Sequence, residues 1–312
     1  MSLIKAAATV SSLTLLSRIT GVVRDMLIAR YFGSSAATDA FYVAFRLPNM
    51  LRRLFAEGAF QQAFVPMLSD VKATTSETEV RTFIDRIFSV LASALVITSI
   101  IGVLAAPVLV WLIAGGLAEN PAGFDLAVEM TRWMFPYIFF MSLVAMSAGV
   151  LNTWKHFAIP AFTPVLLNIS FITFTLLLTP HLDRPIMALA VAVIVGGVLQ
   201  LGIQIPSLMR LGVLPRPVNP ITALKDIAVR RVLKLMVPAL FGVGVAQLSL
   251  LINTNIASRL ATGSVTWLSF ADRLMEFPTA LLGVALGSVL LPSLAGAYAK
   301  GDLERYNSLL DH

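Results

Sequence analysis

The sequence predicts an all-α polytopic membrane protein with about eight transmembrane helices. Of its 312 residues, 57% are hydrophobic and only 13% are charged, and the mean hydropathy is +0.84. A soluble domain carries about 25% charged residues. The apolar residues come in runs long enough to cross a bilayer, which takes about 20 residues in a helix. Composition and run length therefore place the chain among helical membrane proteins.

The apolar runs mark eight expected spans, and several are long enough to tilt, kink or extend into water. Their approximate bounds are Ala8–Phe32, Ala37–Leu68, Phe83–Ala114, Leu126–Trp154, Pro160–Thr179, Pro185–Met209, Leu233–Ser258 and Val265–Tyr298. Prolines lie inside many of them, at Pro48, Pro107, Pro136, Pro206, Pro238 and Pro278. Such breaks are tolerated where neighbouring helices or a cavity satisfy the freed backbone groups, although proline is also simply frequent in membrane helices.

Lysine and arginine alternate between the two sides of the expected bundle. With the N-terminus in the cytoplasm, the cytoplasmic segments hold Lys5, Lys72, Arg81, Arg86, Lys155, Arg210, Arg216, Lys225, Arg230, Arg231, Lys234, Lys300 and Arg305. The opposite side holds only Arg30, Arg184 and Arg259. This bias predicts a multi-pass membrane protein with a cytoplasmic N-terminus. The same topology accounts for the net charge of +6, so no nucleic-acid partner is expected.

Two other features narrow the class. The chain has no cysteine, which excludes a disulfide framework and a thiolate metal site. The opening residues MSLIKAAATV lack the charged segment and cleavage site of a signal peptide, so the first apolar run is expected to remain as a helix.

The chain also resembles itself. Ile28–Leu47 reads IARYFGSSAATDAFYVAFRL and Ile256–Leu274 reads IASRLATGSVTWLSFADRL, which places Arg30 against Arg259 and Arg46 against Arg273. Downstream, VPML at 65–68 falls against LPSL at 291–294. Apolar segments often match by chance, but the paired arginines and the shared proline favour a duplication.

A duplication would divide the chain into two unequal parts. It predicts a six-helix N-terminal lobe over residues 1–211, a basic cytoplasmic linker over 212–232 and the first two helices of a second lobe over 233–312. An even number of helices in the unit preserves orientation, so the lobes would be related by an axis along the membrane normal. The second lobe is expected to be truncated.

Away from the ends of the expected spans, seven arginines occur: Arg18, Arg24, Arg46, Arg52, Arg53, Arg132 and Arg273. An arginine at the bilayer centre costs about 2.5–3.5 kcal/mol, so these side chains are expected to line a wet cavity or to bind an anion. Arginine binds phosphate through paired hydrogen bonds and stays charged. No lysine occurs among the intramembrane charges, which favours a phosphate or pyrophosphate ligand, although chloride could also be bound in the arginine cavity.

The second expected span carries a polar stripe. At about 100° per residue, six side chains fall within about 60° of one line: Asp39, Arg46, Asn49, Arg53, Glu57 and Gln61. Arg52 lies to the side. The stripe is expected to form a cavity wall, and Arg53 and Glu57 can pair within the helix. The alternative is that such pairs merely neutralise each other between helices.

Charged groups in three further spans complete the candidate set. In the first span, Ser17 and Arg24 share one face and Arg18 and Asp25 share the adjacent face. In the eighth, Asp272, Arg273 and Glu276 cluster just before Pro278. Arg132 follows Glu129 by three residues near a helix end, so a structural pair or a side chain that extends to the membrane surface is expected there.

These residues carry a family resemblance. SRITGVVRDMLIARYFGSSAATDAFYVAFRLPNMLRRLFAEGAFQQAFVPML (Ser17–Leu68) and ADRLMEFP (Ala271–Pro278) resemble the signature of the MurJ (MviN) family, within the multidrug/oligosaccharidyl-lipid/polysaccharide exporter superfamily. The resemblance covers the whole chain in order. It implies two helical lobes around a central cationic cavity. The chain stops in what resembles the connection after the eighth helix, so the rest of the second lobe is expected to be absent.

The resemblance also implies roles for individual residues. Arg18, Arg24, Arg52 and Arg273 match cavity arginines expected to bind the pyrophosphate and head group of the substrate. Ser17, Asp25, Arg53 and Glu57 match positions associated with the cavity or its gate, and Asp39 matches a functionally important acidic position. Arg46, Asn49 and Glu276 join this cavity or gate set from the stripe and the eighth span.

The implied function is that of a lipid II flippase, a transporter that moves undecaprenyl-pyrophosphate-linked peptidoglycan precursor from the inner to the outer leaflet by alternating access. The resemblance implies a monomer in the bacterial cytoplasmic (inner) membrane, in contact with membrane lipids. No cofactor and no catalytic residue are expected. One alternative is a flippase for another polyprenyl-linked saccharide. Another is a membrane enzyme acting on lipid pyrophosphates, but His156, His181 and His312 lie in loops or at the end. A structural scaffold would leave the intramembrane arginines unexplained.

Overall fold

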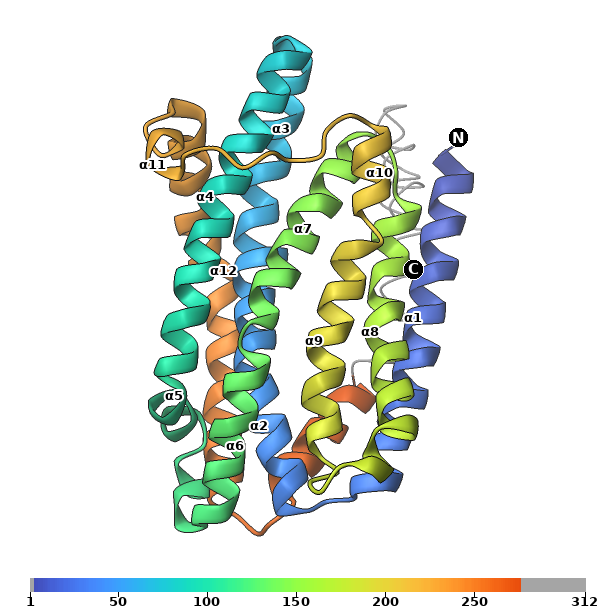
Figure 1. The fold of residues 1–312 in the computed structure, drawn as a ribbon, viewed down its shortest axis with the longest axis vertical. Helices are drawn as coiled ribbons and strands as arrows, with labels where there is room; N and C mark the ends of the chain where they lie inside the picture. The colour runs from blue at the N-terminus through green and yellow to red at the C-terminus, as the bar shows by residue number, and fades with distance from the viewer. Residues whose placement is uncertain (1–2, 276–312) are drawn as a thin grey trace, which may run out of the picture.

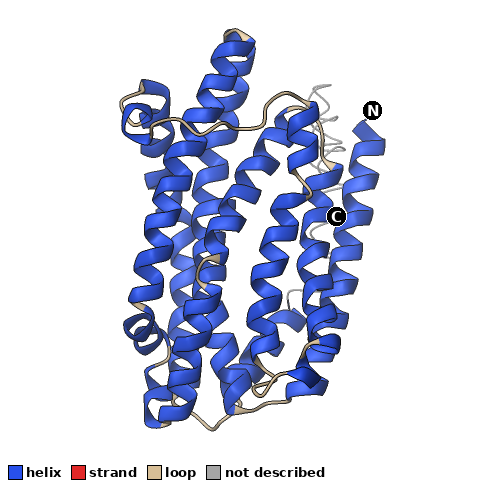
Figure 2. Ribbon diagram, in the orientation of Figure 1, coloured by secondary structure: helices blue, strands red, loops and turns tan. Residues whose placement is uncertain are grey.

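The computed structural model describes residues 3–275, which form a bundle of long helices joined by short turns (Figures 1 and 2). No β-strand occurs in this range, so the predicted all-α class is confirmed. The first expected span is α1 (Leu3–Phe32). It ends at Gly33, whose φ of +60° turns the chain, and Ser35 then caps the next helix by accepting a hydrogen bond from the Thr38 amide.

The second expected span is longer than predicted and changes its helical form twice. It consists of α2 (Ala36–Leu51), the π-helix η1 (Arg52–Phe60) and α3 (Gln61–Thr74). The remaining elements are α4 (Glu77–Leu104), α5 (Ala106–Ile113), η2 (Gly115–Glu119), α6 (Pro121–Met134), α7 (Tyr137–Thr153), α8 (Ala158–Leu177), η3 (Thr179–His181), α9 (Met187–Gly202), α10 (Ile205–Arg210), α11 (Pro220–Ala223) and α12 (Ile227–Ser258). Residues 264–275 are also helical.

Proline breaks three of the expected spans where the sequence places it. The third span divides into α4 and α5 two residues before Pro107, the fourth into α6 and α7 at Pro136, and the sixth into α9 and α10 just before Pro206. A proline lacks the N–H that continues the helical ladder and clashes with the preceding turn. In α12, which contains Pro238, the two parts Ile227–Gly242 and Gln247–Ser258 meet at 49°.

Four helical segments of residues 3–275 are long and apolar enough to cross a membrane, or five if the bent α12 counts as one span. They are Glu77–Leu104, Pro121–Thr153, Ala158–Leu177 and Met187–Arg210. The chain is therefore a polytopic helical membrane protein. The first two expected spans, which carry most of the intramembrane charges, are not among these four, and most of the eighth lies outside the described residues.

The two ends of the bundle carry different connections (Figure 1). The N-terminus, the α3–α4 turn, the α7–α8 turn and the long linker after α10 lie at one end, which we call the N-terminal end. The α1–α2 turn, η2, the α8–α9 connection and the turn after α12 lie at the other, which we call the far end. The predicted separation of basic loops therefore corresponds to a separation in space.

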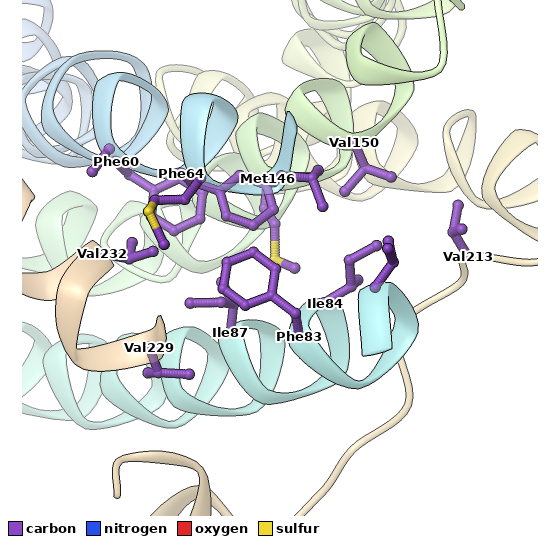
Figure 3. Close-up of a cluster of buried hydrophobic side chains, with 14 of the residues drawn as sticks. Phe60, Phe64, Phe83, Ile84, Ile87, Met146, Val150, Val213, Val229 and Val232 are labelled. Atoms are coloured by element: carbon purple, nitrogen blue, oxygen red, sulfur yellow. The ribbon is translucent and has the colours of Figure 1, made fainter. Parts of the chain in front are cut away.

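The apolar core ties α12 to the preceding helices. Figure 3 shows a cluster near the N-terminal end that joins α3, α4, α7 and α12. The Phe64 and Phe83 rings stack with their centroids 6.0 Å apart, and Val229 and Val232 of α12 are fully buried beside them. Farther along, α12 packs against η1. This packing holds η1 and α3 in place beside the polar interior.

Candidate functional site

The polar interior begins where α2 changes into the π-helix η1. Pro48 lies in the last turn of α2, and the Arg52 amide donates to the carbonyls of both Pro48 and Asn49. The sequence predicted an α-helix bent at Pro48, so the π-helix is a correction. A π turn holds more residues than an α turn, and π-helical segments are often found at functional sites. Because of this change in residues per turn, the side chains from Asp39 to Gln61 do not follow the single 100° spacing of an α-helix.

The stripe residues consequently meet different partners. Asp39 lies at the far end of the bundle, Arg46 faces residues 264–275, and the Gln61 amide donates to the Ala145 carbonyl of α7 over 2.7 Å. Asn49 accepts hydrogen bonds from Arg52 Nε at 3.1 Å and Nη2 at 2.9 Å. The Glu57 side chain and the whole of Glu276 lie outside the residues that the structure describes. The Arg53–Glu57 pair therefore stays a prediction.

Asp39 joins α2 to the start of the 264–275 helix. Its Oδ2 accepts from the Gly263 amide at 2.6 Å, and its Oδ1 accepts from the amide and the hydroxyl of Thr266 at 2.8 and 2.6 Å. The residue is only 6% exposed. A carboxylate that accepts orphan amides at a helix N-terminus is stabilised by those bonds and by the helix dipole. Asp39 therefore fastens the bundle at its far end.

The centre of the site is an ion-pair cluster formed by Arg24, Asp25 and Arg273. Arg24 Nε and Nη2 lie 2.9 and 2.7 Å from Asp25 Oδ1, and Arg273 Nε lies 3.4 Å from Asp25 Oδ2. Arg24 Nη1 donates to Asn168 Oδ1 over 2.9 Å, and its guanidinium carbon lies 5.4 Å from the centre of the Phe171 ring. Arg24 is only 8% exposed, and its guanidinium is held by Asp25, Asn168 and Phe171.

A second, looser ion pair lies between α2 and the 264–275 helix. Arg46 Nη1 lies 3.7 Å from Asp272 Oδ2, and Arg46 Nη2 donates to the Ser269 hydroxyl over 3.3 Å. These residues line a small cavity of about 170 Å³ that also contacts the central cluster. Polar residues of α2 therefore face polar residues of the 264–275 helix along much of their shared length.

A larger cavity of about 960 Å³ lies beside the central cluster. Its walls come from α1, α2, η1, α7, α8, α9 and the 264–275 helix, and its lining reaches Asn152 and Phe157, which flank the α7–α8 turn at the N-terminal end. Among the residues that the structure describes, its charged lining consists of five arginines and one aspartate: Arg18, Arg24, Arg52, Arg53, Arg273 and Asp25. The structure thus brings together all four arginines that the sequence singled out as ligands, with Ser17 and Asn49 beside them.

The described lining of this cavity carries more arginines than carboxylates. Asp25 lies between two of these arginines, and Asn49 accepts hydrogen bonds from Arg52. Within residues 3–275, no hydrogen bond or ion pair engages the Arg18 side chain. A cavity with low-dielectric walls strengthens the attraction of an anion to such charges. The arrangement can bind a multiply charged anion such as a phosphate or pyrophosphate group.

Sequence reasoning missed several residues of the two cavities. Asn152, Asn168 and Gln200 line the larger cavity and Phe171 lines the smaller one, and the amide side chains in otherwise apolar runs were the available signal. Of the two expectations for Arg132, the pair with Glu129 does not form. Glu129 instead pairs with Arg184 at 2.5 Å, and Arg132 is exposed away from the cavity.

The chain is similar to known proteins over its whole length. A family model described as "Lipid II flippase MurJ" matches residues 28–312. A protein of Burkholderia cenocepacia named "Lipid II flippase MurJ" is 55% identical over 312 residues. Proteins of Buchnera aphidicola and Vibrio cholerae, each named "Probable lipid II flippase MurJ", are both 41% identical, over 311 and 316 residues. These matches take in 99–100% of this chain but only 60% of each relative.

Proposed function

Because the chain belongs to the lipid II flippase MurJ family, whose members are membrane transporters and not enzymes, we propose that it acts in moving lipid II across the bacterial cytoplasmic membrane. The substrate would be the undecaprenyl-pyrophosphate-linked precursor of peptidoglycan, carried from the inner to the outer leaflet. The chain would work as a monomer among membrane lipids. It spans about 60% of the length of its relatives, and its first six helices would form one lobe and its last two the opening of a second.

The observation that carries this proposal is the cavity whose described lining holds five arginines and one aspartate, among helices that cross a membrane. Positive charge is costly in a bilayer, so a site that concentrates arginines favours an anionic ligand. Arginine offers parallel donors that match phosphate oxygens. A pyrophosphate would engage Arg18, Arg24, Arg52 and Arg273, while the apolar tail stays in the lipid. A chloride ion could balance the arginines between substrates.

The closed far end supports alternating access. Asp39 fastens α2 to the start of the 264–275 helix there, while the cavity lining extends toward the N-terminal end. With the N-terminus in the cytoplasm, the cavity would receive the lipid head group from the inner leaflet. Transport would then require that the Asp39 hydrogen bonds break as the lobes rock, and that the arginine–pyrophosphate pairs loosen for release. The membrane potential, worth about 2.3 kcal/mol per charge per 100 mV, could assist this step.

A translocation assay with lipid II tests the proposal. Arg24→Ala and Arg273→Ala remove two of the four proposed ligands, and we expect each to abolish transport. Arg259→Ala is the matched control, because Arg259 lies at the far end, where its Nε contacts Asn255, and does not line the cavity. Thermal unfolding of each variant separates lost binding from lost folding.

Full transport by well-folded Arg24→Ala and Arg273→Ala variants would contradict the assignment. Competition between lipid II and another polyprenyl-pyrophosphate-linked saccharide distinguishes the two substrates, since both share the pyrophosphate and differ in the sugar.

A further inference from the structure

Asn168 is a buried amide in the middle of α8, where its neighbours in sequence are apolar. It is 5% exposed and lies between α8 and α1. Its Oδ1 accepts a hydrogen bond from Arg24 Nη1 at 2.9 Å. Its Nδ2 donates to the Ser17 carbonyl at 2.9 Å and to the Thr20 hydroxyl at 3.1 Å. One side chain therefore connects the backbone of α1 to the guanidinium of Arg24.

The partners fix the orientation of this amide. The Arg24 nitrogen can only donate and the Ser17 carbonyl can only accept. A flipped amide would set two donors against each other at Arg24 and two acceptors against each other at Ser17. The oxygen must therefore face Arg24 and the nitrogen must face α1. Asn168 can satisfy both groups at once because it carries a donor and an acceptor on the same short side chain.

From this geometry we propose that Asn168 is a positioning residue, which aims Arg24 at the phosphate oxygens of the transported lipid and keeps the site cationic. The inference rests on the proposed function, in which Arg24 binds pyrophosphate. In this proposal Asn168 does not bind the substrate directly but acts through Arg24.

The hydrogen bonds of Arg24 support the positioning role. A guanidinium has five N–H donors. Its bonds with Asp25 use Nε–H and one hydrogen of Nη2, and its bond with Asn168 uses one hydrogen of Nη1. With respect to the described residues, one donor then remains on each terminal nitrogen. Two such donors match two oxygens of a phosphate group. Without Asn168, the guanidinium could rotate about the Asp25 contact and lose this aim.

The neutrality of Asn168 supports the second half of the proposal. Asp25 already offsets one positive charge in the cluster that it shares with Arg24 and Arg273. A second carboxylate, at position 168, would lie within hydrogen-bond distance of Arg24 and would weaken the attraction of this guanidinium for an anion. An amide supplies the acceptor that Arg24 needs without that loss. The chemistry of the position therefore calls for asparagine over aspartate.

The test measures the affinity of the purified chain for farnesyl pyrophosphate, a lipid pyrophosphate with a short tail. Asn168→Leu removes both functions of the amide, and we expect about a tenfold loss of affinity. Asn168→Asp keeps the side-chain shape and the acceptor, and we expect at least as large a loss because of its charge. In an Arg24→Ala background, Asn168→Leu is expected to cause no further loss, as a residue that acts only through Arg24 requires.

Asn255→Leu is the matched control. Asn255 also connects a backbone carbonyl, that of Leu112, to an arginine, but its partner is Arg259 at the far end. Wild-type affinity is expected for this variant. Unchanged affinity in folded Asn168→Leu, or a full additional loss in the Arg24→Ala background, would overturn the inference. If Asn168→Leu does not fold, undiminished affinity in Asn168→Asp would overturn it.

The same measurements separate this inference from the function it rests on. Equal affinity of wild type and Arg24→Ala would remove the proposed role of Arg24, and the inference with it. Loss in Arg24→Ala without loss in the Asn168 variants would remove the inference alone.

Discussion

Asp39 shows how one residue can join two distant segments of the chain. Its carboxylate accepts three hydrogen bonds from Gly263 and Thr266 and is almost fully buried. Gly263 has a φ of +97°, and a Cβ there would lie 3.1 Å from the Ser34 Cβ, so this turn leaves little room for a side chain. These hydrogen bonds act together with the apolar packing of Val265 at the far end.

Asp39→Asn is expected to weaken this connection. The amide has one acceptor oxygen, and its NH₂ group would face a backbone N–H, so a buried donor would lose its partner. That loss costs about 1–3 kcal/mol and should lower the midpoint of thermal unfolding. Asp183→Asn is the control, because Asp183 is exposed on the α8–α9 connection at the same end. Equal midpoints for the two variants would show that the Asp39 bonds contribute nothing.

Two properties separate the site residues that the sequence could identify from those that it could not: the free-energy cost of placing the side chain in a membrane, and the distance along the chain to its partner. Arginines in apolar runs are expensive enough to require a purpose, so Arg24 and Arg273 were identifiable. Asn168 was not, because a single amide is cheaper and its partner Arg24 lies 144 residues away. Ser17 was identified from the helix face that it shares with Arg24 and from the family resemblance, and the group that Asn168 contacts is its backbone carbonyl.

At the scale of elements, three helix breaks were predictable from prolines, whereas the π-helix was not predictable. A proline disfavours the helical ladder through local sterics, and interruptions occur near Pro107, Pro136 and Pro206. α3 and α8 nevertheless continue through Pro66 and Pro164, so a proline alone does not fix a break. The form of η1 depends also on what surrounds it, since α12 and α7 pack along it. Pro48 and Gly58 mark a weak point in the second segment but do not specify i→i+5 hydrogen bonding there.

The contact between η2 and the end of α12 makes a prediction about packing. A Cβ at Gly116 would lie 2.2 Å from the Ser258 carbonyl oxygen, so Gly116→Ala must push two backbones apart. We expect a destabilisation of about 1–3 kcal/mol, seen as a lower midpoint of thermal unfolding.

Gly202→Ala is the control for this change. A Cβ there meets nothing within 4 Å, and alanine is favoured over glycine in a helix by up to about 1 kcal/mol. A Gly116→Ala midpoint at or above that of Gly202→Ala would show that the clash relaxes without cost.

The whole molecule keeps the asymmetry that its charges predicted. The basic linker, the α3–α4 turn and the N-terminus share one end, and the connections that carry Arg30, Arg184 and Arg259 share the other (Figure 1). The internal repeat gains a spatial counterpart as well. Asp39 and Thr266 each lie seven residues before the paired Arg46 and Arg273, and they bond to each other. That contact is where a pseudo-symmetry axis between two lobes would pass.

The direction of transport depends on which end of this bundle faces the cytoplasm. The sequence contains no cysteine, so single introduced cysteines report on sidedness. Ala73 near the end of α3 and Asp183 at the far end are both exposed. We expect Asp183→Cys to react with a membrane-impermeant maleimide in intact spheroplasts, and Ala73→Cys to react only after permeabilisation, with the cysteine-free parent as control. This result would direct the cavity lining at Asn152 and Phe157 toward the inner leaflet, where the proposed cycle begins. Labelling of Ala73→Cys from outside would invert the bundle and, with it, the proposed direction of transport.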